Sequence, residues 1–193
     1  MRTATNKRIT KETSLSGMLN LDGTGQATIN TGIGFFDHML TLLAFHADID
    51  LQIEAHGDLH VDDHHTIEDI GIMMGVMIKE ALGDKMGITR YGGFRIPMDE
   101  TLTCVDLDIS GRPYLVFNAD FNREMIKDYS LEMTKEFLYA LAINSGITLH
   151  VNVLYGDNDH HKVESIFKAL GHALAIAVKV NGNKLPSTKG FIQ

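Results

Sequence analysis

The string Asp-His-His-Xaa-Xaa-Glu occurs twice in this chain, at residues 63–68 and at residues 159–164, and each copy begins a long segment with helical spacing. In the first half we expect strands at 2–10, 13–21 and 25–30, a helix at 34–46, a strand at 49–55 and a helix at 64–82. In the second half we expect strands at 89–97, 100–109 and 112–117, a helix at 130–144, a strand at 147–155 and a helix from 160 onward. Both halves therefore have the order strand-strand-strand-helix-strand-helix.

A repeat this long predicts a duplicated α+β unit rather than a solenoid, whose repeats are shorter and number three or more. We expect the first repeat at residues 1–87 and the second at 88–193, the latter including a C-terminal tail. Each unit should place its two helices on one face of a mainly antiparallel sheet. Gly71 and Gly75, within the apolar face of the helix at 64–82, would permit close approach of another backbone.

Composition excludes several classes of protein. The formal net charge of -8 gives no electrostatic basis for binding nucleic acid or an anionic membrane. A single cysteine excludes an intramolecular disulfide framework and is typical of a reducing compartment. The N-terminus lacks an apolar signal core, and no window approaches 18 uninterrupted apolar residues. We therefore expect a soluble, cytoplasmic protein.

The twin strings have the spacing of metal ligands. On a helix, positions i and i+4 lie close together while i and i+1 diverge, so His64 and Glu68 can bind one ion while His65 points toward a second. The second copy repeats this arrangement. Imidazole and carboxylate ligands suit transition metals such as Mn, Fe or Zn. The pattern predicts two metal ions.

A competing interpretation treats the strings as polar helix starts with Asp63 and Asp159 as N-caps. We expect this capping as well, but it explains neither the double histidine nor its recurrence. Symmetry proposes two sites that share ligands between the repeats, one from His64, Glu68 and His161 and the other from His160, Glu164 and His65. His38 and Glu136 occupy equivalent helix positions, and each could complete a site. His46, two turns beyond His38, could face the same site.

Basic and hydroxyl side chains at the ends of expected elements suggest an anion pocket within this acidic chain. The candidates are Arg90, Arg112, Lys168, Ser187, Thr188 and Lys189. The last three lie in a tail whose Gly190 permits close backbone approach, which favours a phosphate ester as ligand.

Seven strings, in order, resemble the imidazoleglycerol-phosphate dehydratase family of histidine biosynthesis along essentially the whole chain. They are Arg8–Thr13, Thr31–Leu40, Asp63–Asp69, Pro97–Glu100, Ser110–Pro113, Asp159–His161 with Phe167–Ala169, and Pro186–Gly190. The resemblance implies a tandem pair of units similar to the second domain of ribosomal protein S5. It also implies trimers that assemble into a cage of 24 chains, with ligands from neighbouring subunits completing each metal site.

The resemblance further implies two Mn²⁺ ions per active site. One would be held by His64, Glu68, residue 136 and His161, and the other by His38, His65, His160 and Glu164. The substrate site would comprise Glu12, His38, His46, Arg90, Arg112, Lys168, Ser187, Thr188 and Lys189. Many members have histidine at position 136, where this chain has glutamate. His172 and Ser165 also depart from the common arginine and alanine on the last helix.

The implied reaction dehydrates D-erythro-imidazole glycerol phosphate to imidazole acetol phosphate through a metal-stabilised imidazolate. We expect Glu164 to be the base, with Glu12 and His46 as alternatives for proton transfer. Two other functions stay open at this point. A metal-storage cage would need the same histidines without a phosphate pocket, and a dinuclear phosphoesterase would cleave the ester itself.

Overall fold

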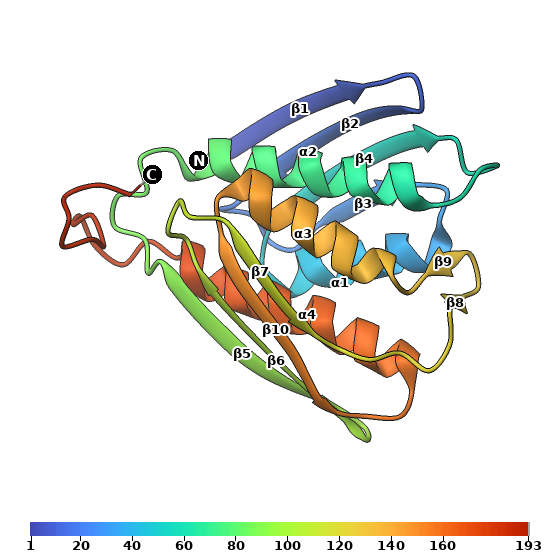
Figure 1. Cartoon of the computed structure of the whole chain (residues 1–193). Coiled ribbons are helices and arrows are strands. Elements are labelled where there is room, and N and C mark those ends of the chain that lie inside the picture. Colours follow the sequence, from blue (N-terminus) through green and yellow to red (C-terminus); the bar gives the residue numbers. More distant parts are fainter. Residues whose placement is uncertain (193) are drawn as a thin grey trace.

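The computed structural model describes residues 1–192, which form two units with the same order of elements (Figure 1). The first contains β1 (Thr3–Ile9), β2 (Thr13–Asn20), β3 (Ala27–Asn30), α1 (Gly34–His46), β4 (Asp50–Gly57) and α2 (His64–Leu82). The second contains β5 (Tyr91–Met98), β6 (Thr101–Asp108), β7 (Tyr114–Asn118), α3 (Met133–Ser145), β10 (Thr148–Tyr155) and α4 (Asp159–Val178).

The two sheets have equivalent topologies. Their strand orders are β1-β2-β4-β3 and β5-β6-β10-β7, and in each sheet only the last pair is parallel. The predicted α+β architecture of two βββαβα repeats is therefore confirmed. Buried residues alternate with more accessible ones, as in β6, so one face of the sheet is covered by the helices.

The four helices lie between the two sheets, and one hydrophobic core extends through both repeats (Figure 1). Helix α1 of the first repeat packs on α4 of the second, while α3 packs on α2. Glycines permit both contacts: a Cβ on Gly71 would lie 2.8 Å from the Phe137 carbonyl oxygen, and one on Gly171 would lie 2.8 Å from the Leu43 carbonyl oxygen. The expected close approach at Gly71 is thus confirmed.

All four helices begin at the same end of the molecule, where a short hairpin of β8 (Met125–Ile126) and β9 (Tyr129–Ser130) also lies (Figure 1). The C-terminal tail lies at the opposite end. Within residues 1–192, no helix combines the length and apolar character needed to span a membrane.

Two local expectations were wrong. Helix α3 begins at Met133 rather than at 130, because Ser130 pairs with Met125 in the hairpin and gives its backbone N–H to Asp63. The side chains of Asp63 and Asp159 do not cap their helices either. Instead, the backbone N–H of His64 donates to the side chain of Asp62, and that of His160 donates to the side chain of Asn158. Each acceptor is the residue just before the aspartate of its string.

Candidate active site

Helix crossing brings three of the predicted metal ligands together at the start of α4. The Nε2 atom of His160 lies 3.0 Å from Oε2 of Glu164, one turn along the same helix. Because α1 packs on α4, Nε2 of His38 lies 3.7 Å from the same carboxylate oxygen. The other oxygen, Oε1, accepts a hydrogen bond from Lys168 Nζ at 2.6 Å.

The carboxylate of Glu164 is held in its ionised form. Burial alone would raise its pKa, but the hydrogen bond from Lys168 and the neighbouring His160 outweigh burial and lower the pKa below its usual range. Both oxygens are engaged, so the group is better suited to ligating a cation than to accepting a proton.

Helices α2 and α3 form the equivalent pair in the other half of the molecule. His64 and Glu68 lie in the first two turns of α2 and are partly exposed, as is Glu136 in the first turn of α3. Because Gly71 fits against the Phe137 carbonyl, the start of α3 runs beside the start of α2, as α1 runs beside α4. His38 and Glu136, which have equivalent positions in the two repeats, therefore also lie on equivalent helices in the structure.

The second histidine of each string points away from the first. The ring centroids of His64 and His65 are 6.1 Å apart, and those of His160 and His161 are 6.2 Å apart. Each second ring donates from Nδ1 to a carboxylate, as the following distances show. The Nδ1 of His65 lies 3.0 Å from Asp58 Oδ2, and that of His161 lies 2.8 Å from Glu100 Oε2. This contact fixes the tautomer and makes Nε2 the nitrogen that is available to a metal ion.

These carboxylates also change pKa values. The hydrogen bond to Asp58 raises the pKa of His65. Glu100 accepts from the backbone N–H of Asn158 and from His161, so its pKa lies far below the usual range. Glu12 extends from the turn after β1 and lies 3.9 Å from Nε2 of His65.

The donor set fits divalent transition metals, but one chain does not complete a site. Imidazole Nε2 atoms and carboxylates in the first turns of neighbouring helices are the ligands such ions prefer. Within residues 1–192, however, no three His, Cys, Asp or Glu side chains converge tightly enough to hold a metal ion by themselves. His65 and His161 contact Asp58 and Glu100 rather than the clusters that they would complete, so ligands from a second copy would be required.

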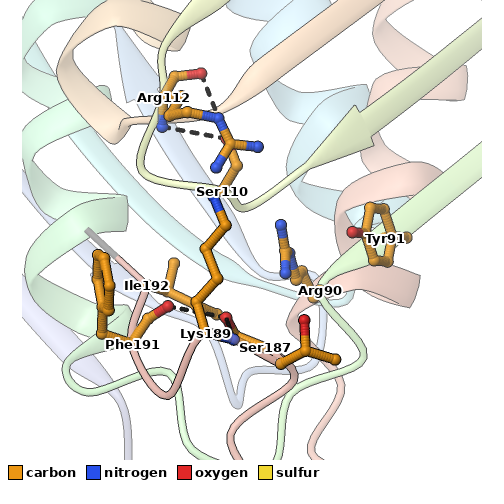
Figure 2. A pocket seen from close by; sticks show the side chains of 9 residues that line it. Arg90, Tyr91, Ser110, Arg112, Ser187, Lys189, Phe191 and Ile192 are labelled. Carbon is orange, nitrogen blue, oxygen red and sulfur yellow. Dashed lines mark hydrogen bonds between the residues drawn. The ribbon is translucent and has the colours of Figure 1, made fainter.

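A basic pocket of about 280 Å³ (Figure 2) includes residues of the C-terminal tail and therefore lies at the other end of the molecule (Figure 1). The side chains of Arg90, Arg112 and Lys189 point toward its centre, and Ser110, Ser187 and Thr188 add hydroxyl groups. Five of the predicted anion-binding residues therefore line one pocket. The sixth, Lys168, does not line it within this chain, because it pairs with Glu164.

Asp108 orients the guanidinium groups of this pocket. Arg90 donates from Nε and Nη2 to the two Asp108 oxygens at 2.7 and 3.1 Å, and from Nη1 to the Pro186 carbonyl at 2.8 Å. Arg112 Nη2 lies 3.9 Å from the same carboxylate. The Asp108 hydrogen bond raises the pKa of Arg90, which keeps a fixed positive charge beside the tail.

His46 lies between the two regions. Its ring is 4.7 Å from that of His172, which stacks on Phe94 at 4.3 Å. Burial, together with the positive fields of His172 and Lys168, lowers the pKa of His46. The imidazole is therefore neutral at pH 7 and is able to accept a proton.

The comparisons with known proteins agree with this geometry. A family model described as imidazoleglycerol-phosphate dehydratase matches residues 31–174. The chain belongs to the imidazoleglycerol-phosphate dehydratase family. It is 56% identical over 194 residues to the imidazoleglycerol-phosphate dehydratase of Exiguobacterium sp. strain AT1b, and the alignment covers 100% of both chains.

Solved structures of the imidazoleglycerol-phosphate dehydratase family share the fold. The Staphylococcus aureus enzyme has a TM-score of 0.85 at 44% identity, covering 93% of this chain and 99% of that one. The Pyrococcus furiosus enzyme has a TM-score of 0.84 at 36% identity, covering 97% and 100%. Membership confirms the predicted enzyme class, a dehydratase and hydro-lyase of histidine biosynthesis.

Sequence reasoning missed the residues that orient others. Asp58 and Glu100 bind the predicted metal ligands His65 and His161, and Asp108 binds the predicted substrate-binding residue Arg90. Glu100 lies within one of the strings that carried the family resemblance, so it could have been found there. Asp58 and Asp108 had no local signal, because their partners are distant in sequence or on another element.

Proposed function

We propose that this chain dehydrates imidazole glycerol phosphate to imidazole acetol phosphate, using two Mn²⁺ ions per active site. One observation carries the proposal: a histidine-glutamate cluster at the start of α4, with its counterpart residues at the start of α2, occurs in the same chain as a basic pocket. A substrate with an imidazole at one end and a phosphate at the other matches both halves of that arrangement.

We assign the metal ligands as the sequence suggested. Residues His38, His160 and Glu164 form one partial site, with His64, Glu68 and Glu136 as its counterpart. His65 would complete the first and His161 the second, each from another copy. When bound, the metal ions would act as Lewis acids toward the imidazole ring.

The chain's own residues would hold the substrate and move its protons. Arg90, Arg112 and Lys189 would bind the phosphate, with Ser187 and Thr188 donating hydrogen bonds. Glu164 has both oxygens engaged and a lowered pKa, so proton transfer falls instead to Glu12 or His46. Glu12 is exposed beside His65, and His46 is neutral at pH 7.

We further propose that the active site forms between copies, within trimers that assemble into a 24-mer. The backbone N–H of Arg90 donates to the Ala177 carbonyl, which lies 13 residues beyond Glu164 on α4. At 1.5 Å per residue this is roughly 20 Å, much longer than a glycerol phosphate chain. The basic pocket and the Glu164 cluster of one chain therefore cannot hold one substrate molecule together.

An apolar surface near the start of α2, the helix that carries His64 and Glu68, supports contact between copies. Leu59, Val61 and Met125 are exposed around a hollow next to the start of α2. Clustered exposed apolar side chains of this kind are typical of interfaces. A cytoplasmic location is consistent with the single cysteine.

The test incubates Mn²⁺-loaded protein with imidazole glycerol phosphate and measures the ketone product and free phosphate separately. Ketone formation that is lost in His160→Ala supports the dehydratase. Phosphate release without ketone would instead establish a phosphoesterase. Metal binding with neither product, and with no rise in melting temperature on adding substrate, would leave metal storage as the function.

A further inference from the structure

The connection between β7 and α3 differs sharply from its counterpart in the first repeat. Three residues, 31–33, join β3 to α1, whereas fourteen residues, 119–132, join β7 to α3 and include the β8–β9 hairpin. We name residues 119–132 the bridging segment. It lies at the end of the molecule where all four helices begin (Figure 1).

The bridging segment is anchored to α4 through Asp159, whose side chain is only 2% exposed. The Asp159 carboxylate accepts the backbone N–H groups of Asn122 and Arg123 at 2.9 and 3.0 Å. Lys162 Nζ donates to Asp159 at 3.0 Å and to the Asp120 carbonyl at 2.8 Å, which ties the same segment to the next turn of the helix. His160 immediately follows this anchor.

The bridging segment is anchored to α2 in an equivalent way. Asp63 accepts the backbone N–H and the hydroxyl of Ser130, both at 2.7 Å. Asp63 is 7% exposed and immediately precedes His64. The same aspartate of each repeated string therefore holds the same segment, although the two strings lie in different repeats.

Two further contacts reach the remaining helices. Asp128 accepts the N–H of Gly34, the first residue of α1, at 3.3 Å. The hydroxyl of the buried Tyr129 bonds to Thr134 of α3 at 2.9 Å, and its ring contacts Phe35, which in turn meets the His160 ring at 5.1 Å.

We propose that the bridging segment positions the two metal-binding helices relative to each other, with Asp63, Ser130 and Asp159 as positioning residues. Because Asp62 and Asn158 accept the N–H groups of His64 and His160, the following aspartates are free to bind the segment. The hydrogen bonds of the bridging segment hold Asp63 and Asp159 in place. These residues directly precede His64 and His160, so the bonds also set the direction in which those two imidazoles point. This inference rests on the proposed metal sites.

Ser130→Ala tests the proposal, because it removes one hydrogen bond to Asp63 and leaves the backbone bond in place. Co²⁺ is titrated into the metal-free protein, and its affinity and visible absorption bands are recorded. We expect affinity to fall about tenfold, as for groups that orient metal ligands, and the bands to shift. Ser130→Thr retains the hydroxyl, so its Co²⁺ affinity and absorption bands should match those of the parent protein. Ser16→Ala, on the exposed face of β2, should change neither the affinity nor the bands.

A purely structural role would lower the thermal midpoint in chelator without changing Co²⁺ affinity or the absorption bands. That result overturns the inference. Asp63→Asn provides an independent measurement if Ser130→Ala does not fold: it should also weaken binding, and in the double variant the two effects should be less than additive. Full affinity in Asp63→Asn would likewise overturn the inference. A parent protein that binds no Co²⁺ would instead overturn the proposed metal sites, and this inference with them.

Discussion

Gly71→Ala is expected to destabilise the protein although alanine is the better helix former. A Cβ at residue 71 would lie 2.8 Å from the Phe137 carbonyl oxygen and 2.9 Å from the Ala140 Cβ, neither of which can rotate away. Overpacking against fixed atoms costs up to about 3 kcal/mol, and the gain in helix propensity returns about 0.8 kcal/mol. The net loss in free energy of unfolding is therefore up to about 2 kcal/mol.

For a chain of this length, about 2 kcal/mol corresponds to a fall of roughly 4–8 °C in the melting temperature. The assay is thermal unfolding followed by circular dichroism, with chelator present so that metal binding does not contribute. Gly34→Ala is the control, because a Cβ there would meet only the flexible Lys127 Nζ at 3.6 Å. A Gly71→Ala protein that melts at or above the parent temperature would refute the packing argument.

Three further predictions concern the pocket, the metal ions and acid stability. Arg112→Ala should lower kcat/KM about 10- to 100-fold by removing a charged phosphate contact, while Lys7→Ala, on exposed β1, should not. Chelator should dissociate the proposed 24-mer, and an unchanged native mass would argue against metals at the interface. The Thr24 and Gln26 N–H groups lower the pKa of Asp50, so its contribution to stability is present above the usual pKa and disappears as pH falls through the lowered value. Asp50→Asn should therefore show a smaller loss of melting temperature between pH 6 and pH 3 than the parent; an equal loss would contradict this.

The fold was predictable because its signals are local and periodic. The alternating residues of β6 and the spaced apolar residues of α2 specify each element, and Gly71 indicated where two helices meet. The β8–β9 hairpin was not predicted, since its turn at Lys127-Asp128 lacks a glycine although Lys127 has a φ of 56°.

The sequence allowed the residues of the candidate site to be predicted, but not where in the molecule they would lie. Helix geometry placed His160 next to Glu164, and tertiary packing then added His38. The basic pocket lies at the opposite end of the molecule because the tail folds back beside Arg90, through contacts such as that with the Pro186 carbonyl. Such long-range contacts leave no periodic trace in a single sequence.

In the function proposed above, the two repeated strings together hold two metal ions per chain. The most direct test of this claim is the metal content of Mn²⁺-reconstituted protein after removal of free ion, measured by elemental analysis against protein concentration. We predict two Mn²⁺ per chain in the parent and a clear loss in both His64→Ala and His160→Ala. Parent protein without bound Mn²⁺, or variants that retain two ions per chain, would contradict the account.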